Sequence, residues 1–188
     1  MITDQLLRQG AITEIVGPLS SGRTSLFIAC LRAVTRRGAV AAVVDAERAF
    51  DPASAARAGV DLARLLWVRC GGRRDAALRA ADRLVRCPGF ALVGLDLGEM
   101  SPRLSPAAAF RLKFAVERTN AALLIVGRRR VAGSSASLVV ETVRRGLDWA
   151  GPGPAPTHLA RLLADVRILR AHQTPRAPTA PPPLAFCA

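Results

Sequence analysis

Tyrosine is absent from this chain, and aromatic residues make up only 4% of its 188 positions. Few rings are available to stack on nucleobases, so base stacking on a series of aromatic side chains is not expected as a binding mode. Hydrophobic residues nevertheless make up 51% of the sequence. Alanine, valine and leucine must therefore build the core, and the length is that of about one globular domain.

Cysteine and histidine are scarce and widely spaced. The chain has four cysteines and two histidines, and no two cysteines form a CxxC pair. This pattern predicts neither a zinc site nor a disulfide framework. The sequence also lacks a basic and apolar signal at its start and any uninterrupted run of about 18 apolar residues. We therefore expect a reduced, cytoplasmic location and no membrane partner.

Lysine is almost absent as well, because Lys113 is the only lysine among 27 basic residues. The formal net charge is +13, and residues 101–188 carry +9 of it. A basic excess favours polyanions or acidic protein surfaces through a long-range attraction that salt weakens. A general drift of the coding sequence towards arginine is an alternative explanation for this composition.

A loop with two glycines lies within residues 12–26, ITEIVGPLSSGRTSL. A phosphate-binding loop needs a strand, glycines whose backbone N–H groups surround phosphate oxygens, and a helix N-terminus. Here Gly17 and Gly22 are five positions apart, and Thr24 stands where a magnesium-binding hydroxyl is expected. The residues predicted to form the nucleotide loop are Gly17, Pro18, Ser20, Ser21, Gly22, Arg23, Thr24 and Ser25.

Arg23 occupies the position at which such a loop normally carries a lysine. A guanidinium is planar and wider than an ammonium group, so the replacement is not conservative in a closely fitted phosphate cradle. We expect that phosphate can still bind, whereas tight ATP binding is doubtful and ATPase activity is weak or lost. The drift towards arginine is the alternative explanation for this residue.

Apolar runs alternate with helical patterns along the first two thirds of the chain. The sequence predicts strands at residues 13–16, 39–44, 65–68, 90–95 and 121–126. It predicts helices at residues 24–31, 51–58, 73–86 and 105–119. Strands separated by helices favour right-handed crossovers, so we expect an α/β fold with a mostly parallel twisted sheet and helices on both faces.

The pattern is less regular after Gly127. We predict a helix over residues 138–145, a loop over 151–156 and a final strand over 162–169. The core domain then comprises residues 1–172. The proline-rich stretch 173–188 has no periodic pattern and is predicted to be a disordered tail.

Two of the predicted strands are followed by acidic residues, at the edge where parallel sheets bind ligands. Glu47 comes shortly after the second strand, where a carboxylate can orient a water for attack on a γ-phosphate. Asp96 follows the fourth strand, as a Walker-B acid does, and with Thr24 it is the predicted magnesium ligand. Alternatively, an acid at the end of a parallel strand, such as Asp45 or Asp96, only caps the next helix.

Several segments resemble one family. GAITEIVGPLSSGRTSL, VVDAERAFDP and AARAGVDL resemble the ATPase core of bacterial RecA recombinases, and the similarity continues to about Arg170. Others are more similar to ImuA-type proteins, the RecA-like accessory factors of SOS mutagenesis: ASAARAGVDLARLLWVRCGG, ALVGLDLGEM, LLIVGRRRVAGS and LARLLADVRILRA. The resemblance implies a RecA-like P-loop NTPase core with ATP and magnesium as the family's cofactors, and it places Glu47 at the catalytic glutamate.

The chain departs from the RecA pattern at positions that sense nucleotide. Gly127-Arg128 stands where RecA has an Asn-Gln pair that senses the γ-phosphate, and the segment after Gly71 offers no tyrosine to stack on adenine. About ten residues precede the core, where RecA has a helix and strand that dock on a neighbouring subunit. We therefore expect no filament assembly by this chain alone.

The resemblance implies a non-catalytic adaptor in DNA repair and SOS-induced translesion synthesis. Its implied partners are an ImuB-like Y-family polymerase homologue, RecA and the error-prone C-family DNA polymerase, at a nucleoid-associated location. Two alternatives are a DNA-dependent ATPase of recombination type, and a regulator that binds RecA or single-stranded DNA through the basic C-terminal half.

Three consecutive arginines mark the place where the second DNA-binding loop of RecA begins. Arg128, Arg129 and Arg130 are candidate contacts to DNA phosphates, and a solvated turn is the alternative interpretation. The two tryptophans, Trp67 and Trp149, are interpreted as core or interface residues rather than as platforms for base stacking.

Overall fold

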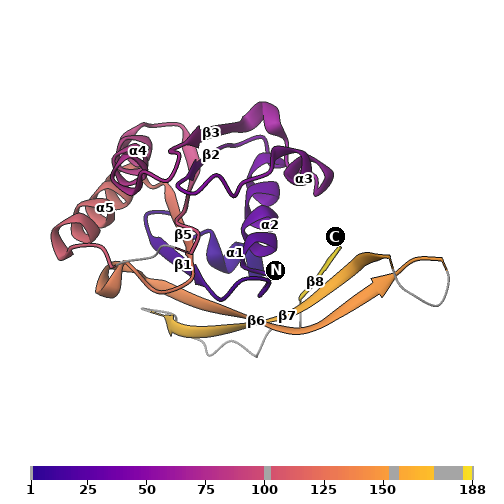
Figure 1. The fold of residues 1–188 in the computed structure, drawn as a ribbon. Helices are drawn as coiled ribbons and strands as arrows, with labels where there is room; N and C mark the ends of the chain where they lie inside the picture. Colours follow the sequence, from indigo (N-terminus) through magenta and orange to yellow (C-terminus); the bar gives the residue numbers. More distant parts are fainter. Residues whose placement is uncertain (1, 100–102, 153–156, 172–183, 188) are drawn as a thin grey trace.

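The fold is built around one eight-stranded sheet (Figure 1), seen in a computed structural model that describes residues 2–99, 103–152, 157–171 and 184–187. The strand order is β3-β2-β4-β5-β1-β6-β7-β8. The first six strands in this order run parallel to one another, and the last two pairings are antiparallel. The expected mostly parallel α/β sheet is confirmed.

The five strands predicted from apolar runs are all present. They are β1 (Ile12–Val16), β2 (Val40–Asp45), β3 (Leu65–Arg69), β4 (Phe90–Asp96) and β5 (Ala122–Gly127). Strands β1 and β5 are buried along their whole length, as expected for central parallel strands covered on both faces. The carboxyl ends of β1, β4 and β5 therefore meet at one edge of the sheet, where the loop after β1 lies.

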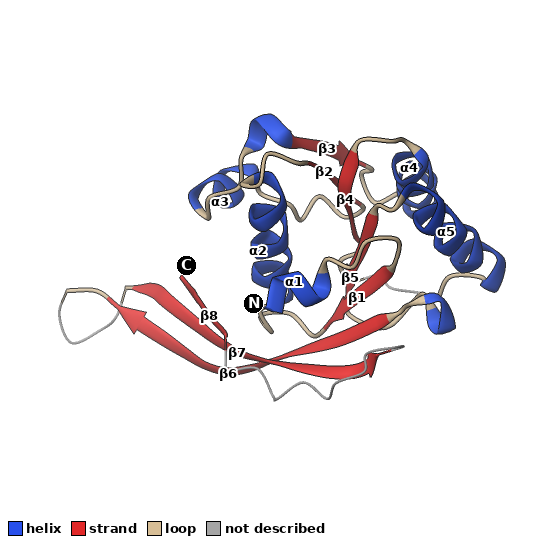
Figure 2. Cartoon of the chain, turned by 180° about the vertical axis from the view of Figure 1, so that it is seen from behind, coloured by secondary structure: helices blue, strands red, loops and turns tan. Residues whose placement is uncertain are grey.

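Helices cover both faces of the sheet (Figure 2). On one face lie α1 (Ile2–Leu6), α2 (Arg23–Thr35) and α3 (Pro52–Arg57), and on the other lie α4 (Arg74–Arg86) and α5 (Pro106–Thr119). Two short 3-10 turns, Leu62–Arg64 and Gly133–Ser135, complete the connections. Each face of the sheet has its own hydrophobic core, so the sheet is the middle layer of a three-layer α/β/α arrangement.

Local side-chain chemistry sets where these helices begin. The Asp51 carboxylate accepts the backbone N–H groups of Ala53 and Ser54 at the start of α3, and proline follows at the first helical position. Ser105 caps α5 in the same way through Ala108. None of the helices in the described ranges has the length and apolarity needed to cross a membrane.

The helix predicted over residues 138–145 is wrong, because this segment belongs to strand β6 (Leu138–Ala150). Leu138 and Val140 pack in one core and Val139 in the other, which is the two-residue alternation of a strand. Strand β6 pairs with β1 and with β7 (His158–Ala171), which contains the final strand predicted over 162–169. The two strands form a long hairpin that extends past the helical layers (Figure 1).

A third strand of this region, β8, lies within the stretch predicted to be disordered. Strand β8 (Leu184–Cys187) pairs antiparallel with residues 161–164 of β7. The prediction of disorder is therefore wrong for these four residues, since the free edge of β7 offers backbone hydrogen bonds to a chain with no periodic pattern of its own. Residues 172–183 and 188 lie outside the described part of the chain.

Candidate nucleotide-binding loop

The loop between β1 and α2 has the backbone of a phosphate-binding loop. Gly22, which directly precedes α2, has φ +94°, a conformation that side-chain-bearing residues rarely adopt. A Cβ atom on Gly17 would lie 2.5 Å from the hydroxyl oxygens of both Ser21 and Thr142. Gly22 is therefore required by its backbone conformation, and Gly17 is required because the Ser21 and Thr142 hydroxyls leave no room for a side chain. Thr24 is exposed in the first turn of α2.

The Arg23 side chain turns back onto its own loop. Its Nη1 atom donates a hydrogen bond of 2.5 Å to the carbonyl oxygen of Gly17, and its Nη2 atom forms an ion pair with the carboxylate of Glu99. Only 8% of the side chain is exposed. The cation at the centre of the loop is thus already bonded to a backbone oxygen and to an internal carboxylate.

Glu99 joins the loop to the segment after β5. Its second oxygen lies 3.5 Å from the guanidinium of Arg128, and the Arg128 backbone N–H donates to the carbonyl of Gly98 at 3.2 Å. The backbone N–H of Glu99 donates to the Glu47 carboxylate at 3.0 Å. We refer to Arg23, Glu99 and Arg128 as the arginine–glutamate bridge.

Glu47 and Asp96, the predicted catalytic and magnesium residues, lie at this same edge. A Cβ atom on Gly98 would approach within 2.0 Å of the Glu47 carboxylate, so Gly98, with φ +58°, leaves the space that this side chain occupies. Asp96 is 5% exposed and accepts the N–H of Gly98 at 2.9 Å. The fold therefore brings together the predicted residues Arg23, Glu47 and Asp96.

Asp45 has a structural role. Its carboxylate is fully buried and accepts the backbone N–H groups of Ala49 and Phe50 at 3.0 and 3.2 Å. The indole N–H of Trp67 donates to the same carboxylate at 3.3 Å, and its ring packs against Phe50 with centroids 5.6 Å apart. Asp45 therefore holds the loop after β2 and does not cap the next helix, because α3 begins at Pro52 and is capped by Asp51. The predicted packing role of Trp67 is confirmed. Trp149, in contrast, is 55% exposed on the hairpin.

Burial raises the pKa of Asp96 above its ordinary value, and the Asp45 and Glu47 carboxylates act in the same direction. An acid whose pKa rises on folding stabilises the fold at low pH, and this contribution is lost as the pH rises through the raised pKa. We predict that Asp96→Asn, which still accepts the Gly98 N–H, is more stable than the wild type near neutral pH. Urea unfolding at about pH 4 and about pH 7 measures the difference, which should shrink at the lower pH.

The exposed Asp148, replaced by asparagine, is the matched control for this comparison, because 52% of its side chain is in contact with solvent. Its substitution should change stability little at either pH. A stability gain for Asp96→Asn that is the same at both pH values would contradict the prediction.

The space over the loop is small. A pocket of about 120 Å³ is lined by residues from two parts of the chain, namely Leu19, Ser20, Ser21, Gly22, Arg23, Thr24, Ser25 and Leu162. Leu162 belongs to β7, so the hairpin forms one wall of the pocket. The hydroxyl of Thr142 on β6 also contacts Ser21 at 2.7 Å. The hairpin therefore shapes the loop from the side opposite the bridge.

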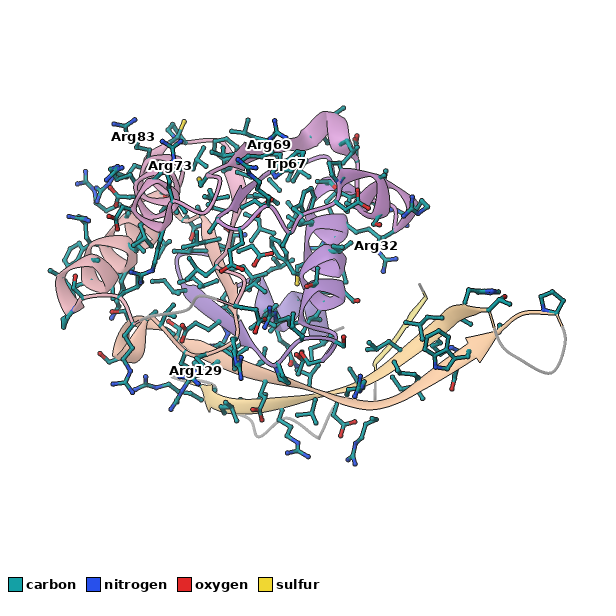
Figure 3. The ribbon with its side chains drawn as sticks, in the orientation of Figure 1. Arg32, Trp67, Arg69, Arg73, Arg83 and Arg129 are labelled. Carbon is teal, nitrogen blue, oxygen red and sulfur yellow. The ribbon has the colours of Figure 1, made fainter. Side chains whose placement is uncertain are left out.

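The three consecutive arginines do not act as one group. Arg128 belongs to the arginine–glutamate bridge, whereas Arg129 and Arg130 are exposed without being part of it. Arg129 extends away from the body of the fold in Figure 3, far from the edge at which Trp67 and Arg69 lie. Contact with DNA through this turn stays a prediction.

Three residues that the sequence did not single out belong to the site or support it: Glu14, Glu99 and Thr142. Glu14 is 1% exposed, and its Oε1 accepts the backbone N–H groups of Val131 and Ala132 at 2.6 and 2.9 Å. A charge in the middle of an otherwise buried strand was the available signal, since such a group must be hydrogen bonded. Glu99 and Thr142 carried no comparable signal.

Comparisons with known proteins place the chain in a family. The model of the RecA N-terminal domain matches residues 6–110. Protein RecA of Prochlorococcus marinus strain MIT 9211 is 43% identical over 96 residues, which are 50% of this chain and 26% of that protein. Protein RecA of Borreliella afzelii is 38% identical over 97 residues, 51% of this chain and 26% of that protein. The matched part thus spans about a quarter of these relatives.

The fold can be compared over nearly the whole chain. The crystal structure of the RadB recombinase has a TM-score of 0.66 and 17% sequence identity, with 98% of this chain and 91% of that chain covered. This likeness concerns the fold alone, and it includes the region beyond residue 110. Because the RecA N-terminal model matches more than half of the sequence, the chain belongs to the RecA family.

Proposed function

We propose that this chain serves DNA repair as a RecA-family adaptor whose nucleotide loop is closed by its own side chains. The observation that carries the proposal is the arginine–glutamate bridge. In a working phosphate-binding loop the cation is available to phosphate oxygens. Here the guanidinium of Arg23 is neutralised by Glu99 and bonded to the carbonyl of Gly17.

The dimensions of the loop support this proposal. Ligand pockets for molecules of nucleotide size are about 300–1,000 Å³, whereas the pocket over this loop is about 120 Å³. Asp96, the predicted magnesium ligand, is 5% exposed and already accepts the backbone N–H of Gly98 at 2.9 Å. The residues present therefore do not fit ATP with magnesium in this arrangement, and we assign them no hydrolytic step.

We further propose that the adaptor acts in SOS-induced translesion synthesis, at a nucleoid-associated location in the cytoplasm. Its partners would be an ImuB-like Y-family polymerase homologue, RecA and the error-prone C-family polymerase. The support is the sequence resemblance of segments that include the ends of β4 and β5, together with the loss of an available cation at the loop. A RecA-family chain whose loop does not bind nucleotide can still use the surfaces of the fold to bind other proteins.

Coexpression tests the adaptor proposal directly. We predict that the chain copurifies in a stoichiometric complex with an ImuB-like polymerase homologue, and that the complex persists without ATP because the loop is closed by protein groups. Size-exclusion chromatography with light scattering measures the stoichiometry. Full-length RecA, which has its own nucleotide loop, is coexpressed with the same polymerase homologue as a control. It shows how a contact that depends on ATP behaves in this experiment. Absence of a complex at micromolar concentration would argue against the proposed partner.

A further inference from the structure

Helix α5 presents two aromatic side chains to solvent. Phe110 and Phe114 are 57% and 54% exposed, and they stand one helical turn apart with ring centroids 5.4 Å from each other. They are two of only six phenylalanines in the chain. Single exposed apolar residues are ordinary, whereas two exposed aromatic rings in contact on one helix are a candidate interaction surface. We call this pair the aromatic ridge.

A groove lies between α4 and α5, and the two phenylalanines are not part of its lining. It has a volume of about 180 Å³ and is lined by Asp75, Leu78, Arg79, Asp82, Ala108, Arg111 and Leu112. Figures 1 and 2 both show α4 and α5 side by side, on the face of the sheet opposite α2. Arg111 connects the two features, because it follows Phe110 in sequence and its Nε lies 4.0 Å from Asp82 across the groove.

The surface around the ridge is basic. The two helices carry seven basic and only three acidic residues. Arg79, Arg83, Arg86, Arg111 and Arg118 are exposed, and Arg83 extends outward from α4 in Figure 3. An apolar ridge with a positive border is complementary to an apolar stripe with a negative border.

We propose that the aromatic ridge, together with the exposed arginines of α4 and α5, docks an acidic amphipathic helix of a protein partner. Side chains four residues apart on α5 form a ridge that fits between the ridges of another helix. Leucine or phenylalanine side chains of the partner cover Phe110 and Phe114, and its glutamates or aspartates face Arg79, Arg111 and Arg118.

Charge also excludes two other occupants of this surface. A second copy would bring two positive surfaces together, and the stretch 173–188 of this chain contains an arginine and no acidic residue. Nucleic acid is disfavoured because the two rings lie at 50° to each other rather than as parallel platforms. Asp75, Asp82 and Glu117 also interrupt the basic surface with negative charge.

A labelled peptide probe tests the proposal with the full chain. The peptide has about 20 residues, with leucines on one helical face and glutamates on its borders. We expect fluorescence anisotropy to show saturable binding, weakened about tenfold or more in Phe110→Ala/Phe114→Ala and in Arg111→Glu/Arg118→Glu. A scrambled peptide of the same composition and a version with lysine in place of glutamate should bind about tenfold more weakly than the original.

Matched variants on the hairpin control for general loss of exposed groups. Trp149→Ala removes an aromatic side chain of similar exposure, 55%, and Arg144→Glu reverses an exposed charge. Both should bind the peptide as the wild type does, and circular dichroism should show all variants folded. The surface lies across the sheet from α2, so nucleotide titration of the loop should be the same in the ridge variant and the wild type.

Four results would overturn the proposal. They are equal binding of the scrambled peptide, full affinity in the ridge variant, binding of a labelled single-stranded oligonucleotide that depends on Phe110 and Phe114, and a dimer of the chain that the ridge variant abolishes. None of these results bears on the arginine–glutamate bridge, so the docking surface and the closed loop can fail separately.

Discussion

Replacing Arg23 with lysine is expected to open the nucleotide loop and to give ATP binding about tenfold or more tighter than in the wild type. A lysine carries one ammonium group in place of a planar fork, so it cannot hold Gly17 and Glu99 through separate nitrogens as Arg23 does. The phosphates then compete with one carboxylate for a mobile point charge. Titration with a fluorescent ATP analogue, with and without magnesium, measures the change.

The control for this substitution is Arg32→Lys, which makes the same chemical change on the exposed side of α2. It should leave nucleotide affinity unaltered. Glu99→Gln tests the other half of the bridge, because it removes the internal negative charge while keeping the size of the side chain. We expect it to strengthen ATP binding as well, by less than Arg23→Lys, since Arg23 retains its bond to Gly17.

Two outcomes would count against the closed loop. The first is an Arg23→Lys variant that binds ATP no better than the wild type. The second is a wild-type chain that hydrolyses ATP at a rate abolished by Glu47→Gln, which would support the alternative of a DNA-dependent ATPase. In that case the bridge would be a resting arrangement that nucleotide displaces.

Replacing Glu14 with alanine is expected to destabilise the fold by about 3 kcal/mol. The substitution removes the carboxylate that accepts two buried backbone N–H groups, those of Val131 and Ala132. Both donors would then be left without a partner in a dry region between β1 and the segment after β5. For a chain of this length the melting temperature should fall by about 6–12 °C, measured by circular dichroism together with urea unfolding.

Glu117→Ala is the matched control, because Glu117 is exposed on α5 and lies 3.8 Å from Lys113 as an ordinary surface pair. Its loss should cost less than about 0.5 kcal/mol. Glu14→Gln keeps one oxygen acceptor and should fall between the two. A stability loss for Glu14→Ala no larger than that of the control would show that the buried carboxylate is dispensable.

The parts of the fold that could be predicted from sequence have local causes. Strands β1 to β5 are short apolar runs, and the glycine loop and the capping residues Asp51 and Ser105 act within a few positions of themselves. The prediction failed at residues 138–145, where leucine and valine spacing is compatible with either a helix or a strand. Pairing with β1 and β7 decides that choice, and the residues that β6 meets on β1 are more than 120 positions away.

The candidate site likewise has features that the sequence predicts and contacts that it does not. The sequence alone indicated that a strand, two glycines and a helix form a RecA-type loop, that Arg23 replaces its lysine, and that Glu47 and Asp96 each follow an apolar strand. Only the tertiary structure decided what Arg23 does, because Glu99 lies 76 positions away and reaches it through the sheet, in which β5 lies between β1 and β4. Hydrogen bonds and ion pairs are short-ranged, so their partners are chosen by the segments that the sheet brings to one edge, which no local pattern records.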